Sequence, residues 1–200
     1  MNIQKIFFLN KFCVFREDRH YLHSTDIFNQ LKHFLNNKKI KNLEINFKKK
    51  ITNYPYLIIS SEPNFKIKNT YYISLNYTKD NTKYFGYIYQ SREKIFLRKK
   101  YNEKKFQQKL KLRKKSILIP SNTDFDFIQR ITSGAMKFLN DENTTNKKGN
   151  WYLVRLKIKN FVKLDNKNFI KINSLKSNEN ANFFSIHYKK KIGEMLFLKK

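Results

Sequence analysis

Positive charge is the feature that most constrains this chain. Its 200 residues include 43 Lys and Arg against 15 Asp and Glu, which gives a formal net charge of +28. A compact chain with this charge repels itself unless an anionic partner neutralises it. Nucleic acid is the first partner predicted, because its phosphates release counterions when Lys and Arg replace them. An anionic membrane surface is the second.

The apolar content shows that the charged chain can still build a core. Hydrophobic residues make up 40% and aromatic residues 16%, enough for one domain of ordinary size or two small ones. No run approaches the ~20 apolar residues that a membrane span needs. The N-terminal segment reaches Glu17 and Asp18 early and is not expected to be a signal peptide. The single cysteine, Cys13, excludes a disulfide framework and indicates a reducing compartment.

One helix is predicted near the start of the chain. The tripeptide STD at 24–26 is a helix N-cap signal, and apolar residues follow it at helical spacing through Leu35. The next apolar segment, 51–61, is ambiguous. It fits either a helix with Pro55 in its first turn or a buried strand.

Alternating apolar and polar residues predict several strands, and the turn KDNTK joins two of them as a hairpin. A short helix over 127–131 is expected to be interrupted by Gly134, and 141–150 is a polar linker. No internal repeat is visible in the sequence. The predicted strands cover 43–47, 71–77, 84–90, 95–97, 117–119 and 152–158.

Two short polar segments contain residue types found in catalytic or metal sites. Ser121 follows an apolar run and Pro120, but the chain has neither a recognisable histidine motif nor a Gly-x-Ser-x-Gly elbow, so serine catalysis is not expected. Asp124 and Asp126 form a D-x-D pair that could hold Mg²⁺ in a nuclease. Capping of the helix that follows is the favoured interpretation, because Asp is stabilised at the positive end of a helix dipole.

A zinc site built on Cys13, His20 and His23 is the third alternative. Structural zinc sites use four ligands, and the second half of a C-x₂-C pair is missing here. Solvent-facing histidines are therefore the favoured interpretation.

The segment 98–115 holds ten basic residues and one acid, Glu103. A charged face that only contacts water is the usual explanation of such a run. In a chain at +28, however, this density favours binding of phosphate groups. The interleaved aromatics Tyr101 and Phe106 could stack on unpaired bases.

Several segments, in order along the chain, resemble the small-subunit ribosomal protein eight family. The similar segments are TDIFNQLKHFLN (25–36), INFK (45–48), IISSEPNF (58–65), ISLNY (73–77), QSREKIFLR (90–98), ILIPSNT (117–123) and SGAMKFL (133–139). In the family these correspond to the opening helix, a strand, the end of a second helix, a further strand, two RNA-contact segments and a late strand.

The resemblance implies an α+β fold made of two small α/β units. The first, 25–80, would be α-β-α-β-β, and the second, 81–140, would be β-rich with a short helix and would hold the RNA loop. Residues 1–24 and 141–200 would be extensions, the latter with strands.

The resemblance further implies a structural constituent of an organellar small ribosomal subunit that binds rRNA of the central domain and supports assembly. Its partners would be rRNA and neighbouring ribosomal proteins, with no small-molecule substrate, no membrane span, no metal, no cofactor and no catalysed reaction. The expected location is the mitochondrion, with the plastid as the alternative, because Lys, Asn, Ile, Phe and Tyr have A/T-rich codons typical of organellar genomes. Another basic organellar ribosomal or RNA-binding protein, a metal-dependent nucleic-acid enzyme, and an accessory subunit of a membrane complex remain open.

The RNA-binding residues expected from the resemblance and from the basic run fall into three groups. Side chains of the loop would contact sugars, phosphates or base edges, a second segment would carry the other signature, and basic residues would bind phosphates. The groups are Ser121, Asn122 and Thr123; Ser91, Arg92 and Lys94; and Arg98, Lys99, Lys100, Lys111, Arg113, Lys114 and Lys115.

Overall fold

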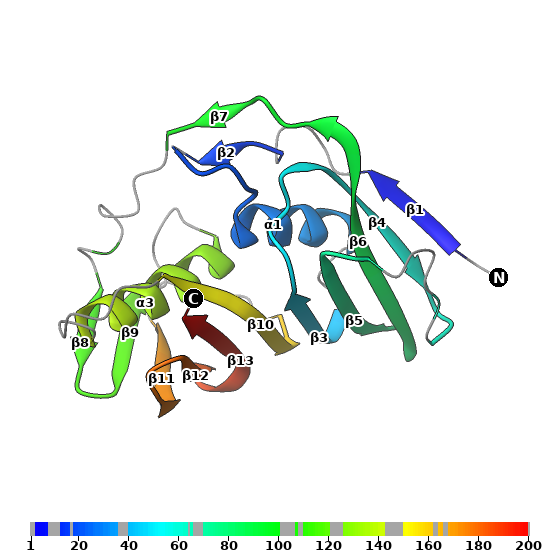
Figure 1. The fold of residues 1–200 in the computed structure, drawn as a ribbon. Helices are drawn as coiled ribbons and strands as arrows, with labels where there is room; N and C mark the ends of the chain where they lie inside the picture. The colour runs from blue at the N-terminus through cyan, green and yellow to red at the C-terminus, as the bar shows by residue number, and fades with distance from the viewer. Residues whose placement is uncertain are drawn as a thin grey trace. The chain divides into compact units, whose positions relative to one another are not determined.

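The computed structural model describes residues 3–7, 13–16, 18–35, 40–63, 65, 70–100, 107, 110–120, 126–142, 150–161, 164–165 and 168–199. They belong to two compact units, Met1–Tyr101 (unit 1) and Asn102–Lys200 (unit 2). In each unit a helix accompanies an antiparallel sheet (Figure 1). Among the described residues, no helix combines the length and the apolar character that crossing a membrane requires.

The described residues of unit 1 form one helix and two sheets. Its main sheet has the strand order β1-β4-β6-β5-β3, with antiparallel neighbours, and β2 and β7 form a separate parallel pair. The elements are β1 (Ile3–Phe7), β2 (Phe15–Arg16), α1 (Ser24–Leu35), β3 (Ile40–Phe47), β4 (Asn53–Ser60), β5 (Ile73–Lys79), β6 (Thr82–Lys94) and β7 (Arg98–Lys99).

Local sequence signals account for α1 and for the β5–β6 hairpin. The predicted N-cap and helix are confirmed, and the apolar stripe that includes Ile27 and Leu31 is buried. The hairpin turns at Asp80 and Asn81, whose φ angles are 47° and 64°. Asp and Asn tolerate this left-handed conformation, which two-residue hairpin turns require.

The ambiguous segment 51–61 is strand β4, which pairs with β1 on one side and with β6 on the other. Its residues Leu57–Ser60 are all buried, so no alternation is visible. Along the strand, Ile58 packs with Tyr87 and Tyr89 in a cluster of mostly aromatic residues. A short apolar run of this kind cannot be assigned to helix or strand from periodicity alone.

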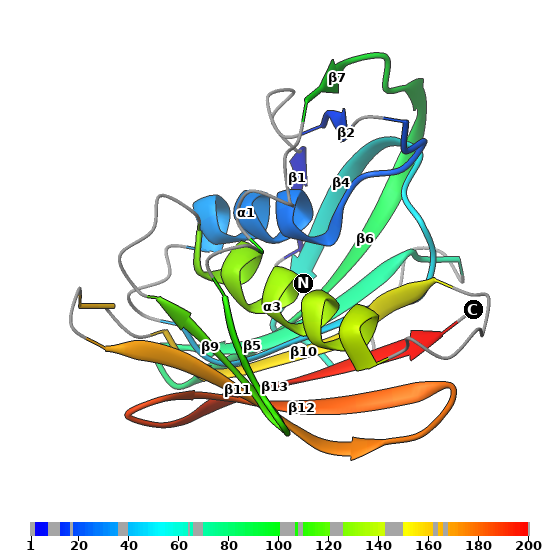
Figure 2. The same ribbon diagram turned by 90° about the vertical axis from the view of Figure 1, so that its left-hand side faces the viewer.

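Unit 2 is a six-stranded antiparallel sheet with α3 packed on one face (Figure 2). The strand order is β10-β13-β12-β11-β9-β8. The Phe138 ring of α3 meets the Phe184 ring of β12 edge-on, with centroids 5.6 Å apart. The elements are β8 (Lys111–Arg113), β9 (Ser116–Pro120), α3 (Phe127–Glu142), β10 (Trp151–Asn160), β11 (Phe169–Ser177), β12 (Ala181–Tyr188) and β13 (Lys190–Lys199).

Helix α3 corrects the prediction that a short helix is interrupted at Gly134. The helix runs through Gly134 to Glu142. A Cβ at Gly134 would lie 2.7 Å from Cδ1 of Ile119 and 3.3 Å from Cδ1 of Ile172. Glycine therefore allows the helix to approach β9 and β11 closely, and it is not a helix terminator here.

The predicted α+β fold with an α-β-α-β-β unit is wrong. The segment 58–65, expected to end a second helix, begins in β4, and 133–139, expected as a strand, lies in α3. The predicted strands at 43–47, 71–77, 84–90, 117–119 and 152–158 do lie in strands, apart from the first two residues of 71–77. The strand predicted at 95–97 is wrong, since these residues connect β6 to β7.

Both units share an element order that the sequence does not reveal. Apart from the short strands β2, β7 and β8, each unit runs strand, helix and then four strands: β1-α1-β3-β4-β5-β6 in unit 1 and β9-α3-β10-β11-β12-β13 in unit 2. The order of these elements along the chain is therefore repeated although no sequence repeat is visible.

Candidate functional site

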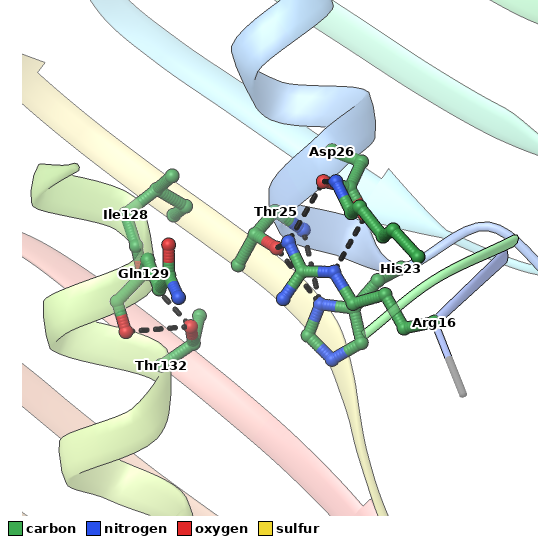
Figure 3. Close-up of polar contacts among 8 residues, drawn as sticks. Arg16, His23, Thr25, Asp26, Ile128, Gln129 and Thr132 are labelled. Carbon is green, nitrogen blue, oxygen red and sulfur yellow. Dashed lines mark hydrogen bonds and ion pairs between the residues drawn. The ribbon is translucent and has the colours of Figure 1, made fainter. Parts of the chain in front are cut away.

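A buried ion cluster lies at the N-terminal end of α1 (Figure 3). The Asp26 carboxylate accepts hydrogen bonds from Nε and Nη2 of Arg16, both at 2.7 Å. Lys99 Nζ lies 2.9 Å from Asp26 Oδ1. The side chains of Arg16 and Asp26 are 4% and 3% exposed, so their opposite charges offset each other inside the protein.

Three elements bring these charges together. Strands β2 and β7 pair in parallel with Arg16 opposite Lys99, which places both cations side by side. Asp26 lies in the first turn of α1, where the helix dipole favours an anion. The cluster thereby fastens β2 and β7 to α1.

His23 is held beside the cluster by Thr25. Its Nδ1 lies 2.9 Å from Thr25 Oγ1, which also accepts a hydrogen bond from Arg16 Nη2 at 2.6 Å. The backbone N–H of Thr25 points to the same Nδ1 at 3.5 Å, so we assign Nδ1 as an acceptor. Burial, and then the charges of Arg16, Arg19 and Lys99, hold the pKa of His23 well below its usual value. The ring is therefore neutral near pH 7.

A hydroxyl beside an imidazole could form a nucleophile. Thr25 is 0% exposed, however, so a substrate cannot reach its hydroxyl. The buried thiol of Cys13 is also unreactive, because burial and then Asp26 raise its pKa to about 12 and the reactive thiolate does not form. The cluster is consequently a structural clamp.

The zinc alternative gains no support from the described part of the chain, where no three His, Cys, Asp or Glu side chains are grouped as metal ligands. Cys13 is buried, His20 is exposed, and Arg98 Nη2 lies 3.0 Å from His20 Nδ1. The prediction of solvent-facing histidines holds for His20 and is wrong for His23, which is half-buried and bonded to Thr25.

In unit 1, several predicted RNA-contact residues have internal roles. Lys99 pairs with Asp26, while Arg98 bonds the carbonyl of Arg19 at 3.3 Å and stacks on Phe15 at 5.6 Å. Ser91 Oγ accepts the backbone N–H of Glu93 in a local turn. The remaining residues of this group, Arg92, Lys94 and Lys100, are exposed.

In unit 2, the basic residues of the β8–β9 hairpin are exposed. Lys111 and Arg113 lie on β8, and Lys114 and Lys115 form its turn. Residues 121–125, which include Ser121, Asn122, Thr123 and Asp124, lie outside the described residues. The Asp126 carbonyl accepts the backbone N–H of Arg130 at 3.0 Å at the start of α3.

A pocket of about 470 Å³ lies in unit 1 beside the C-terminal end of α1. The rings of Tyr77 and Tyr84 stack in it, with centroids 5.2 Å apart and planes 12° apart. Burial, and then Tyr84, raise the pKa of Tyr77 to about 12, so its hydroxyl keeps its proton and can donate a hydrogen bond. The lining residues are Gln4, Lys5, Ile6, Phe34, Leu35, Ile59, Tyr77, Lys79 and Tyr84.

Apolar side chains and positive charge both line the pocket, and polar atoms make up most of its accessible wall. Lys79 and Lys5 are its charged lining residues, and no carboxylate is among them. The ammonium of Lys5 lies 4.6 Å from the ring centre of Tyr56, which leaves Lys79 as the cation assigned to a ligand. The sequence alone does not reveal this site, because its lining residues come from segments far apart in the chain. Alternation along β5, which places Tyr77 and Lys79 on one face, is the signal that could have pointed to it.

Comparisons with known proteins do not assign this chain to a family. No family profile matches it. No curated protein matches it either. Among solved structures, an acyl-ACP thioesterase from Bacteroides thetaiotaomicron shares 8% identity over 100% of this chain and 97% of its own, with a TM-score of 0.45.

Two further solved structures are similar at the same level. A protein described as a thioesterase II from Thermobifida fusca shares 5% identity over 100% of this chain and 93% of its own, with a TM-score of 0.48. A dehydratase domain from Pseudomonas fluorescens shares 10% identity over 97% and 88%, with a TM-score of 0.46. Likeness at this level transfers neither a fold nor an activity to this chain.

These findings correct the functional predictions from sequence. The assignment to the ribosomal protein eight family is wrong, since the second helix and the late strand on which it depended are absent. The predictions of rRNA and ribosomal proteins as partners, of no small-molecule substrate and of no catalysed reaction are contradicted as well. The three solved structures named above are those of two thioesterases and a dehydratase domain, and none of these three is a ribosomal protein.

Proposed function

We propose that unit 1 binds a small amphiphile with an anionic head and an aliphatic tail. The observation that carries this proposal is the pocket, in which Ile6, Leu35 and Ile59 meet a stacked tyrosine pair and Lys79. Its volume of about 470 Å³ falls within the range of small-molecule sites, and its aliphatic side chains lie beside polar groups that can orient a ligand.

The pocket offers contacts for both the aliphatic tail and the anionic head of the ligand. Burial of a tail against aliphatic side chains is favourable by about 0.8 kcal/mol for each buried CH₂ group. The Lys79 ammonium and the protonated Tyr77 hydroxyl are both hydrogen-bond donors, which suits an acceptor-rich head such as a carboxylate. A cationic head would meet Lys79 and Lys5 without a compensating anion from the lining.

Isothermal titration calorimetry with dodecanoate and dodecanol tests the proposal, because the two ligands share a tail and differ in charge. We expect saturable binding of dodecanoate about tenfold tighter than that of dodecanol, since a hydrogen bond to a charged group contributes roughly 1.5–3 kcal/mol. Lys79→Gln should remove most of this preference.

The matched control is Lys49→Gln, which deletes an exposed cation outside the pocket lining and should leave both affinities unchanged. Absence of dodecanoate binding below its solubility limit, or equal binding of both ligands by the unchanged chain, would overturn the proposal.

A further inference from the structure

The face of the unit 2 sheet opposite α3 collects basic side chains from strands far apart in the sequence. Helix α3 covers the face that carries Ile119, Ile172 and Phe184. Because successive side chains alternate between faces, Leu118 and Lys171 belong to the opposite face. We call this opposite side the basic face.

Strand register identifies its first row. Lys111 of β8 pairs with Leu118 of β9, which pairs with Lys171 of β11. Lys171 pairs with His187 of β12, which pairs with Lys191 of β13. Paired residues share a face, and adjacent strands lie about 4.8 Å apart, so this row places Lys171 and Lys191 on either side of His187.

Neighbouring positions add three more cations. Arg113 begins the row that continues through Ser116 and Asn173, and it is exposed. On the other side of the sheet, Lys157 and Arg155 of β10 pair with Glu194 and Leu196 of β13. The six cations of the basic face are Lys111, Arg113, Arg155, Lys157, Lys171 and Lys191.

Nearby cations lower the pKa values of two titratable groups on this face. The pKa of His187 is lowered by its burial and then by the charges of Lys171 and Lys191. The pKa of Glu194 is lowered first by a hydrogen bond from Lys191 and also by the charges of Lys191, Lys157 and Arg155. The cations that contribute to both shifts are the ones that the register places beside each group.

An exposed aromatic side chain lies on the same face. Phe169 is 44% exposed and precedes Lys171 by two residues on β11, so both point to one side. Lys111 Nζ lies 6.0 Å from the centre of the Phe169 ring. A solvent-exposed aromatic ring between cations combines the two features of proteins that bind at a membrane interface.

We propose that the basic face of unit 2 docks on an anionic lipid surface, with the cations at the headgroup phosphates and Phe169 among the headgroups. Two observations favour this occupant. The cations spread over four strands of one sheet face instead of following a single groove, and four of them are lysines, which act as point charges. The proposal is independent of the amphiphile pocket of unit 1.

Sedimentation of the full chain with vesicles tests this docking. We expect binding to vesicles of phosphatidylcholine with roughly one third phosphatidylserine, and none to phosphatidylcholine alone, because a basic residue near an anionic surface contributes about 1 kcal/mol. The double variant Lys111→Gln/Lys171→Gln should weaken binding about 25-fold by this contribution. Phe169→Ser should weaken it as well.

The matched control is Lys41→Gln/Lys49→Gln, which removes the same charge from exposed positions of unit 1 and should retain most of the binding. Equal weakening by both double variants would show that net charge alone acts and would overturn the proposal. Binding to vesicles of phosphatidylcholine alone would also overturn it. A chain that binds a single-stranded oligonucleotide through Lys111 and Lys171, and does not bind the vesicles, would overturn it as well. The pocket of unit 1 is tested with a monomeric ligand and the basic face with vesicles. Either proposal can therefore fail without the other.

Discussion

Asp26 illustrates how one residue organises the start of unit 1. Its carboxylate meets Arg16 from β2 and Lys99 from β7, and Thr25 extends the contact to His23. Loss of one member of a buried ion pair leaves the other charge uncompensated, which typically destabilises a protein by 3–5 kcal/mol. The two cations offset the anion inside the protein and hold the surrounding segments on α1.

His23 should make unit 1 sensitive to acid. Its folded pKa lies below the unfolded value near 6.5, so the folded state prefers the neutral ring. The resulting stability is complete above pH 6.5 and is lost as the pH falls towards the folded pKa. We expect the free energy of unfolding in urea to fall by up to about 1.4 kcal/mol per pH unit in this range.

In His23→Asn this dependence should be weaker, because the amide oxygen can accept from Thr25 without titrating. His33→Gln is the control, since it removes an exposed histidine and should keep the unchanged chain's slope. Parallel pH profiles for the unchanged chain and His23→Asn would refute the assignment.

At the scale of elements, two glycines set how closely neighbours approach. Gly193 of β13 pairs with Ile158 of β10 and with Ile186 of β12. A Cβ at this position would run into the backbone carbonyl oxygen of Lys157. Because a backbone atom cannot rotate away, the strands themselves would have to move.

Gly193→Ala should therefore destabilise the protein by about 1–3 kcal/mol, the usual range for overpacking. Gly134→Ala should be milder, because its obstacle is the Cδ1 end of the Ile119 side chain. Alanine at position 134 also gains about 1 kcal/mol of helix propensity. Urea unfolding of both variants measures the difference, and an equal or reversed order would contradict the packing seen at β10 and β13.

At the scale of the whole molecule, the charge of +28 acts against compactness. Salt screens this repulsion, since the Debye length falls from about 30 Å at 0.01 M to about 8 Å at 0.15 M. We expect the thermal midpoint to rise by about 5 °C over this interval, which corresponds to roughly 1 kcal/mol for a domain of this size class. Sodium and potassium chloride should act alike, and a midpoint that falls with salt would show that internal ion pairs outweigh the repulsion.

Elements with local sequence signals could be predicted without the structure. The N-cap at 24–26 and the apolar stripe specified α1, and alternation specified β3, β5, β6 and β10 in outline. The turn residues Asp80 and Asn81 marked the hairpin. In each case the deciding interaction joins residues that are neighbours in the chain, so their pattern can be read directly.

Contacts between distant segments explain the rest. They account for the strand conformation of β4, for the continuation of α3 through Gly134 and for all three candidate sites. Arg16, Asp26 and Lys99 meet because β2 pairs with β7, and the basic face exists because the register aligns Lys111 with Lys171. A local pattern cannot report such pairings, since burial on both faces removes alternation and strand register depends on contacts between distant segments. For the same reason, similarity of short segments to a ribosomal family was outweighed once the strands were placed.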